Sequence, residues 1–181
     1  MDDLSLHILD IVENAIEAEA TRVEIRVEED IKNNTLRISI KDNGKGMLKE
    51  EIARLRDPFF TTKNKKTGLG IPLLCQSAHE AAGEVRINSI PGKGTEISAT
   101  FQLDHIDRKP LGDLASTLIA LISGHPEVDF IFEYRKNNKG YLLDTEEIKR
   151  ELDGVPINYP GVIKLLKGII KEGIKELMKG G

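Results

Sequence analysis

The chain has 181 residues, of which 39% are hydrophobic and 31% are charged, an ordinary balance for a soluble globular protein of one or two domains. Its 26 lysines and arginines against 30 aspartates and glutamates leave a net charge of -4, so nucleic acid is not expected as a main partner. A single cysteine, Cys75, excludes an internal disulfide bond and fits a reducing cytoplasm. Because we find neither an export signal nor a run of about 18 apolar residues, we expect a cytoplasmic protein without a membrane partner.

The N-terminal residues predict a helix and a hairpin. Asp2 or Asp3 can cap a helix whose apolar residues recur at three- and four-residue spacing over 4–16. Alternating apolar and polar residues over 21–28 and 35–41 then predict two strands joined by a polar turn.

A second helix and a second hairpin follow. After a polar loop region at 57–69, Pro72 suits the first turn of a helix, and Gly83 can end that helix. The segments 84–89 and 96–103 predict a hairpin that turns through Pro-Gly-Lys-Gly. This order predicts an α/β (α+β) two-layer sandwich with helices on one face of a mixed, mainly antiparallel sheet.

A charged stretch that ends in proline, 106–110, is where we expect a domain boundary. The first domain is then 1–106, and the second, 111–181, is a small α+β unit.

The C-terminal unit predicts a helix over 111–123, then a strand over 128–135 that pairs with 141–143. A short helix should follow Asp144, which begins a capping-box pattern, and a last helix should span about 161–179.

The last helix carries a lysine stripe opposite its apolar residues. The lysines are Lys164, Lys167, Lys171, Lys175 and Lys179, and the apolar residues are Val162, Leu166, Ile169, Ile170 and Leu177. Such a stripe can dock on an acidic partner or on anionic lipid, but it is more often a solvated face, and we expect no liposome binding.

Asp10 and Asn14 are four residues apart on the first predicted helix and therefore project from one face. The amide oxygen of Asn14 is a hard, neutral ligand suited to Mg²⁺, and Asp10 could accept a proton from an attacking nucleophile. His7, three residues before Asp10, could orient that carboxylate or share its proton. Taken alone, these residues are more typical of a solvated polar face.

Asp42 ends the second predicted strand and precedes Gly44 and Gly46. A carboxylate there can accept a hydrogen bond from the exocyclic amine of adenine, whereas guanine presents an acceptor at that position. The glycines would let the backbone approach the ring. An Asx turn explains Asp-Asn-Gly equally well without further context.

Gly68, Leu69 and Gly70 directly precede the second predicted helix, where free N–H groups and the helix dipole can hold a polyphosphate. The polar segment before them carries Lys63 and Lys65, which favours a mobile lid over phosphate, with a disordered basic loop as the alternative.

Thr95, directly after the second hairpin turn, could add a hydroxyl to the adenine end of such a site. An ordinary strand threonine is an equal alternative at this position.

Together these residues resemble the GHKL superfamily, which includes gyrase B subunits, heat-shock chaperones, MutL-type repair ATPases and sensor histidine kinases. The matching boxes are 10–18, 42–47, 57–63 and 68–70, and 83–103 resembles the closing hairpin of the family. The resemblance covers roughly residues 4–104 and is closest to the catalytic ATP-binding domain of sensor histidine kinases, because Pro-Phe-Phe-Thr-Thr-Lys precedes the last glycines.

The resemblance implies a Bergerat ATP-binding fold with ATP and Mg²⁺ as ligands. It implies that Asn14 holds the metal and that Asp42, with Thr95 nearby, recognises adenine. The candidate nucleotide-binding residues are Asn14, Ala18, Asp42, Gly44, Gly46, Met47, Lys63, Lys65, Thr67, Gly68, Leu69, Gly70 and Thr95, and the candidate catalytic residues are Asp10 and His7.

The chain departs from the sensor kinases that it resembles. Asp10 stands where MutL-like and gyrase-like ATPases carry a glutamate base and many histidine kinases carry an asparagine. Glu17 stands where some kinases have a phosphate-binding lysine, and Ala81 and Ala82 replace a usual His-Gly pair. Because few residues precede His7, we expect no phosphoacceptor hairpin of the sensor-kinase kind.

Three functions remain open at this stage. The first is transfer of the terminal phosphate of Mg-ATP to a residue on a separate partner protein. The second is an ATP-hydrolysing conformational switch of the MutL or gyrase kind, in which Asp10 activates water. The third is a non-catalytic, ATP-sensing regulatory module.

Overall fold

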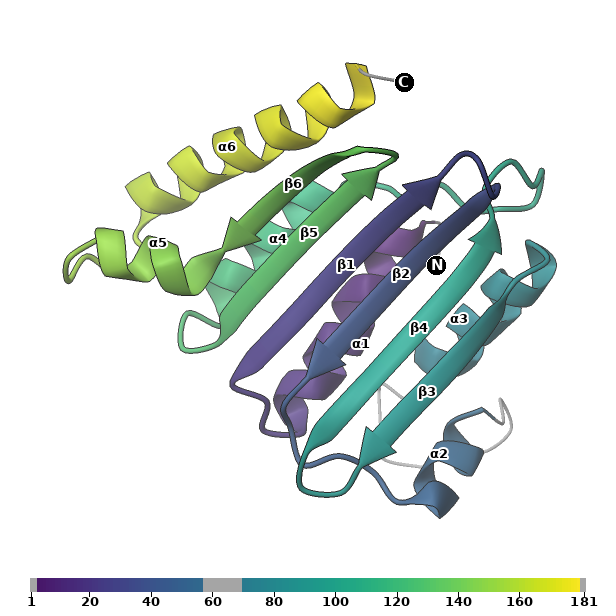
Figure 1. Ribbon diagram of the computed structural model, residues 1–181. Coiled ribbons are helices and arrows are strands. Elements are labelled where there is room, and N and C mark those ends of the chain that lie inside the picture. Colours follow the sequence, from purple (N-terminus) through teal and green to yellow (C-terminus); the bar gives the residue numbers. More distant parts are fainter. Residues whose placement is uncertain (1–2, 57–69, 180–181) are drawn as a thin grey trace.

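The computed structural model describes residues 3–56 and 70–179, and Figure 1 shows a single twisted sheet with helices behind it. The strands are β1 (Arg22–Asp30), β2 (Thr35–Asp42), β3 (Glu84–Ile90), β4 (Gly94–Gln102), β5 (Asp129–Lys136) and β6 (Lys139–Asp144). Within the described residues they form a six-stranded sheet in the order β3-β4-β2-β1-β5-β6. β1 and β5 run parallel and the other neighbours antiparallel, so the mixed, mainly antiparallel sheet is confirmed.

Helices α1 (Leu4–Glu17), α3 (Gly70–Glu80) and α4 (Leu114–Gly124) cover one face of the sheet, and no described helix covers the other (Figure 1). Helices α5 (Thr145–Glu151) and α6 (Pro160–Lys179) lie beside the edge strand β6. This arrangement confirms the two-layer sandwich. A further short helix, α2 (Lys49–Leu55), was not predicted, because it buries no residue and so lacks the apolar stripe that marks the others.

The first turn of α1 is held from two sides. The Asp3 carboxylate accepts a hydrogen bond from the N–H three residues later at 3.1 Å and caps the helix as predicted. The N–H groups of Leu4 and Ser5 donate to the carbonyls of Pro110 and Leu111 at 2.9 and 2.8 Å. The chain that follows the second hairpin therefore satisfies donors that the first turn of a helix leaves free.

Alternation along the strands builds the core between the sheet and its helices. In β1, Val23, Ile25 and Val27 are buried, and the residues between them lie on the open face. In β5 the same alternation buries Phe130 and Phe132, which are among the largest fully buried side chains of the described residues. One continuous hydrophobic cluster includes these residues from both halves of the chain.

The predicted domain boundary at 106–110 falls in the irregular segment between β4 and α4. The residues on its two sides nevertheless share the sheet, because β5 pairs with β1 along the whole strand. Whether 1–106 and 111–181 can each fold alone stays a prediction.

The end of α3 involves the expected glycine and an unexpected alanine. The N–H of Gly83 donates to the carbonyl of Ala78 at 2.7 Å, and a Cβ on Gly83 would overlap the carbonyl of Thr100. The left-handed residue that reverses the chain is Ala82, with φ at 56°. A residue with a Cβ thus occupies a conformation that favours glycine.

Helix α6 turns one apolar stripe to the rest of the protein. Leu166, Ile170 and Leu177 are buried as predicted, whereas Ile169 is 47% exposed, so its assignment to the apolar face was wrong. Because neighbouring helical residues lie about 100° apart around the axis, the residue before Ile170 is turned away from the core. No helix of the described residues has the length and apolar character required to cross a bilayer.

Candidate nucleotide-binding site

A cavity of about 520 Å³ opens between α1, α2 and the strand ends of β2 and β4. Its lining, among the described residues, is Ile11, Asn14, Ala15, Glu17, Ala18, Ile40, Asp42, Lys45, Gly46, Met47, Glu51, Arg54, Leu55, Ile71, Thr95 and Ile97. Of the residues predicted for the nucleotide site, the cavity brings together Asn14, Ala18, Asp42, Gly46, Met47 and Thr95.

Sequence reasoning missed the apolar walls of this cavity. Ile11 and Ala15 come from the face of α1 that the sequence assigned to the core, and Ile40 and Ile97 come from inward positions of β2 and β4. The position of Ile11 held a signal, because a residue three positions from Asn14 shares its face of the helix. The side chains from α2 were missed with the helix itself.

Asp42 lies at the strand end of β2, opposite Thr95 of β4 in the sheet register. Its Oδ1 accepts a hydrogen bond from the N–H of Gly44 at 2.8 Å. Burial raises the pKa of this carboxyl, while the N–H groups of Gly44 and Thr95 oppose the shift. The lining of the cavity therefore includes a partly desolvated hydrogen-bond acceptor.

Gly44 and Gly46 let the loop after β2 lie close to the backbone of other segments. The sequence had instead suggested that these glycines let the backbone approach the adenine ring. The N–H of Lys45 donates to the carbonyl of Ala18 at 2.9 Å, and a Cβ on Gly44 would lie 2.6 Å from the same oxygen. Gly46 has φ at 71°, and a Cβ there would overlap the carbonyl of Ile90. These contacts fix the loop between α1 and β3.

Behind Thr95 lies Ser89, which the sequence analysis did not identify. The two hydroxyl oxygens are 2.7 Å apart, and Ser89 Oγ also accepts the N–H of Met47 at 2.8 Å. The signal was available in the hairpin, because the register of β3 and β4 places Ser89 opposite Thr95.

On α1, Asp10 and Asn14 project from one face as predicted, but they meet different surroundings. Asn14 lines the cavity, and its side-chain amide makes no hydrogen bond to another described residue. Asp10 lies against the start of α3, where a Cβ on Gly70 would overlap its carboxylate. Burial, followed by the negative charges of Glu17 and Glu13, raises the pKa of Asp10.

His7 is buried, with 1% of its surface exposed, and neither ring nitrogen has a hydrogen-bond partner within the described part of the chain. Burial, with a smaller contribution from the charge of Lys109, lowers the pKa of His7 to about 4. Among the described residues no hydrogen bond joins His7 to Asp10, and His7 is not part of the cavity lining. A catalytic role for His7 stays a prediction.

Lys63, Lys65, Thr67, Gly68 and Leu69 lie outside the described residues, so their predicted roles are untested. Gly70 is the first residue of α3.

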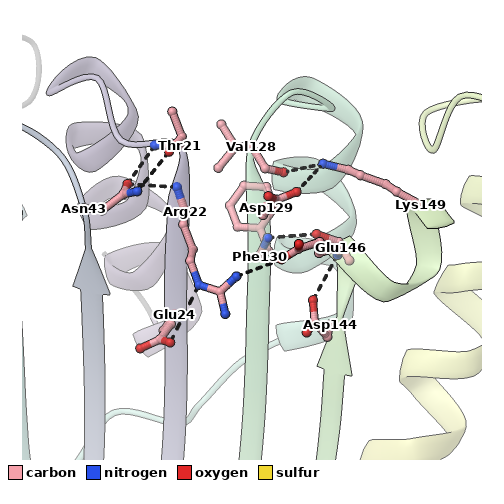
Figure 2. A network of polar contacts seen from close by, with 11 residues as sticks. Thr21, Arg22, Glu24, Asn43, Val128, Asp129, Phe130, Asp144, Glu146 and Lys149 are labelled. Atoms are coloured by element: carbon pink, nitrogen blue, oxygen red, sulfur yellow. Dashed lines mark hydrogen bonds and ion pairs between the residues drawn. The ribbon is translucent and has the colours of Figure 1, made fainter.

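A polar network ties the edge of the site to the C-terminal unit (Figure 2). Asn43, next to Asp42, accepts the N–H groups of Thr21 and Arg22 at 2.9 and 3.0 Å and donates to the Thr21 hydroxyl at 2.9 Å. The guanidinium of Arg22 then reaches Glu146 in the first turn of α5 at 3.1 Å.

A second contact joins the two units on α1. His125, at the C-terminal end of α4, places Nε2 3.0 and 3.1 Å from the two carboxylate oxygens of Glu13. Glu13 directly precedes Asn14, so the C-terminal unit contacts the helix that lines the cavity. Among the described residues no group of three or more His, Cys, Asp or Glu side chains is placed to hold a metal ion.

Comparisons with known proteins identify the family of this chain and several relatives. The model of the family described as histidine kinase-, DNA gyrase B-, and HSP90-like ATPase matches residues 2–105. The sensor protein kinase FleS of Pseudomonas aeruginosa is 40% identical over 110 residues, which cover 61% of this chain and 27% of FleS. The signal transduction histidine-protein kinase AtoS of Escherichia coli is 38% identical over 97 residues, which cover 53% of this chain and 15% of AtoS.

The chain therefore spans less than a third of the length of either relative. Among solved structures, the N-terminal domain of a DNA repair protein superposes with a TM-score of 0.58 at 17% identity, covering 80% of this chain and 53% of that one. At this identity the likeness concerns the fold alone, and it extends beyond the residues that the family model matches. Because that model matches more than half of the sequence, the chain belongs to the histidine kinase-, DNA gyrase B- and HSP90-like ATPase family.

Proposed function

We propose that this chain binds Mg-ATP and transfers the terminal phosphate to a residue on a separate partner protein. Membership of the ATPase family supports ATP binding, and the similarity to FleS and AtoS supports a kinase-like use of it. The observation that carries the proposal is the cavity whose lining includes both Asp42 and Asn14.

At the base end, the Asp42 carboxylate would accept a hydrogen bond from the exocyclic amine of adenine. The apolar side chains of Ile40, Ile97 and Ile71 would surround the ring, because they line the same cavity. A mostly apolar pocket with a few fixed polar groups is the usual form of a small-molecule site.

At the phosphate end, Asn14 fits a Mg²⁺ ligand because it lines the cavity and its amide is not held by another described side chain. When bound there, Mg²⁺ would neutralise phosphate charge. Glu17 lines the same cavity and would repel phosphate oxygens. Phosphate binding there would therefore also need positively charged side chains near the phosphates. The predicted lid lysines, Lys63 and Lys65, are the candidates.

The acceptor is proposed to come from another protein, because the chain has 4 histidines and none of them is among the described residues that line the cavity. His7 is buried, and His125 is engaged by Glu13. A partner protein that presents its own side chain to the cavity would supply the missing nucleophile.

Hydrolysis is the second candidate function, and the surroundings of Asp10 favour it. A carboxyl with a raised pKa, one helical turn from Asn14, is suited to accept a proton from water. Aspartate is one methylene shorter than the glutamate that serves as base in the resembling ATPases, so its reach is the quantity to test.

The deciding experiment follows the terminal phosphate. The purified chain is incubated with Mg²⁺ and terminally labelled ATP, with and without lysate from its own cell, and label is measured in protein and in free phosphate. Label on a partner protein that survives Asp10→Asn supports phosphotransfer. Free phosphate alone, lost in Asp10→Asn, establishes hydrolysis instead. Bound ATP with neither product would leave an ATP-sensing module.

A further inference from the structure

Ser89 sits outside the cavity, at the end of β3, and contacts two residues that line it. Its Oγ lies 2.8 Å from the N–H of Met47, 2.7 Å from the hydroxyl of Thr95 and 3.2 Å from the carbonyl of Gly94. Met47 and Thr95 both line the cavity but come from different segments of the chain, so this one side chain links the two segments.

The proton of Ser89 can be assigned by counting donors and acceptors. A hydroxyl has one proton and two acceptor positions. The N–H of Met47 can only donate, so it occupies one acceptor position of Ser89, and the carbonyl of Gly94 can only accept, so it takes the Ser89 proton. The contact with Thr95 must then be made with the proton of Thr95, because this is the arrangement that satisfies all three contacts.

We propose that Ser89 is a specificity-determining positioning residue, which engages the proton of Thr95 and leaves that hydroxyl as a hydrogen-bond acceptor toward the nucleotide base. The inference rests on the proposed ATP binding. With Asp42 directly opposite Thr95 in the sheet, the base end then presents two acceptors and no side-chain hydroxyl donor from either residue.

This pattern discriminates between purines at their 6-position. The 6-amino group of adenine offers two N–H donors, which suit a pair of acceptors. The 6-oxo group of hypoxanthine or guanine is itself an acceptor, and it meets oxygen lone pairs without a proton between them. If Ser89 is removed, the Thr95 hydroxyl can rotate and donate, so a 6-oxo base would be accepted more readily.

The test compares two ligands that differ at this position, ATP and ITP, each with Mg²⁺. Dissociation constants are measured for the wild type and for Ser89→Ala, Ser89→Thr and Ser98→Ala. Ser98 is the matched control, because it lies on β4 three residues after Thr95 and its hydroxyl faces Ser39 at 3.4 Å instead of the cavity.

We expect Ser89→Ala to bind ATP about tenfold more weakly, the effect of about one lost hydrogen bond, and to narrow the preference for ATP over ITP by a similar factor. Ser89→Thr keeps the hydroxyl and should keep the preference, and Ser98→Ala should match the wild type. Thermal melting without nucleotide shows whether each variant is folded.

A second variant keeps the inference testable if Ser89→Ala does not fold. Thr95→Val removes the hydroxyl through which Ser89 acts, so it should narrow the preference by itself, and adding Ser89→Ala should narrow it no further. Either of two results would overturn the inference alone. The first is a folded Ser89→Ala variant that keeps the wild-type preference for ATP over ITP. The second is that Ser89→Ala narrows this preference by the same factor in the wild type and in Thr95→Val. A wild type that binds neither nucleotide would overturn the proposed function, and the inference with it.

Discussion

The ring of Tyr141 on β6 lies directly over Gly173 of α6, where a Cβ would overlap the ring carbons. The glycine therefore lets the last helix approach the sheet edge. A Cβ added to Gly168, in the same helix, would meet no atom of the described residues within 4 Å apart from its immediate surroundings in the helix. The two glycines of this helix therefore differ in the space beside them.

Gly173→Ala should destabilise the protein, whereas Gly168→Ala should stabilise it. The first inserts a methyl group into a packed contact, at a cost of about 1–3 kcal/mol that exceeds the gain in helix propensity. The second gains about 0.5–1 kcal/mol from helix propensity without a clash. Urea unfolding of the two variants beside the wild type measures both, and equal stabilisation by both would contradict the packing argument.

Ala82→Gly should stabilise the protein by about 0.5 kcal/mol. The left-handed conformation of Ala82 costs about 1–2 kcal/mol that glycine does not incur, and the greater freedom of glycine in the unfolded chain returns part of it. The neighbouring Ala81 is fully buried, and Ala81→Gly should lose about 1 kcal/mol. Melting temperatures that move in the same direction for both variants would refute this assignment.

Local features of the fold were predictable from the sequence. Asp3 and Asp144 cap α1 and α5 by accepting backbone N–H groups, and the alternation in β1 and β2 gives their buried faces. Asn14, Asp42 and Thr95 were predicted to belong to one site, and they do line one cavity. Each of these features depends on residues close together in the chain or on a known motif.

Features that depend on distant partners were not predictable. No local sequence pattern predicts that β5 pairs with β1. These strands are far apart in the chain, and their pairing depends on how well their buried faces pack together. Ser89 was missed because the role proposed for it depends on its hydrogen bonds to Thr95 and Met47, which lie on other segments of the chain. The exposed Ile169 shows the same limit, since one helical position separates a buried side chain from a solvated one.

His7 should make the stability of the protein sensitive to mild acid. Its pKa falls from an ordinary value of 6.5 to about 4 on folding. As the pH falls, the unfolded chain therefore binds a proton at His7 before the folded protein does. The stability that the neutral ring allows above pH 6.5 should then be lost as the pH falls to about 4. The expected loss across this range is about 3 kcal/mol.

Replacing the ring tests this dependence. His7→Leu should flatten the stability curve between those two pH values, and His79→Leu, which changes an exposed histidine of α3, should leave it intact. Urea midpoints measured across the range provide the comparison. Unchanged acid sensitivity in His7→Leu would assign the effect to other groups, and loss of nucleotide binding in that variant would support the predicted functional role of His7.

Asp42→Asn should separate nucleotide binding from stability. Burial raises the pKa of Asp42, so the folded protein disfavours its charge, and the neutral asparagine should leave the free protein at least as stable at neutral pH. Loss of the charged acceptor should weaken ATP binding by about 100-fold.

Asp30→Asn is the matched control for this variant. Asp30 lies at the opposite end of β1, where the side chain and N–H of Asn33 lower the pKa of its carboxyl. Its charge favours the folded state above the ordinary pKa, so Asp30→Asn should lower stability slightly and leave ATP binding unchanged. Isothermal titration with melting curves measures both properties, and tight ATP binding by Asp42→Asn would refute the assignment of the base end.

Removing the C-terminal unit should leave a chain that folds but is less stable. A fragment of residues 1–106 keeps four strands and the matched family region, yet it exposes β1 as a new edge strand. It also loses the carbonyls of Pro110 and Leu111 from the start of α1, and the contact of His125 with Glu13. We expect a loss of at least about 2 kcal/mol, or roughly 10 °C in melting temperature. A fragment as stable as the full chain would show that 1–106 is an independent domain, and a fragment without a cooperative transition would show that the shared sheet makes one domain of both units.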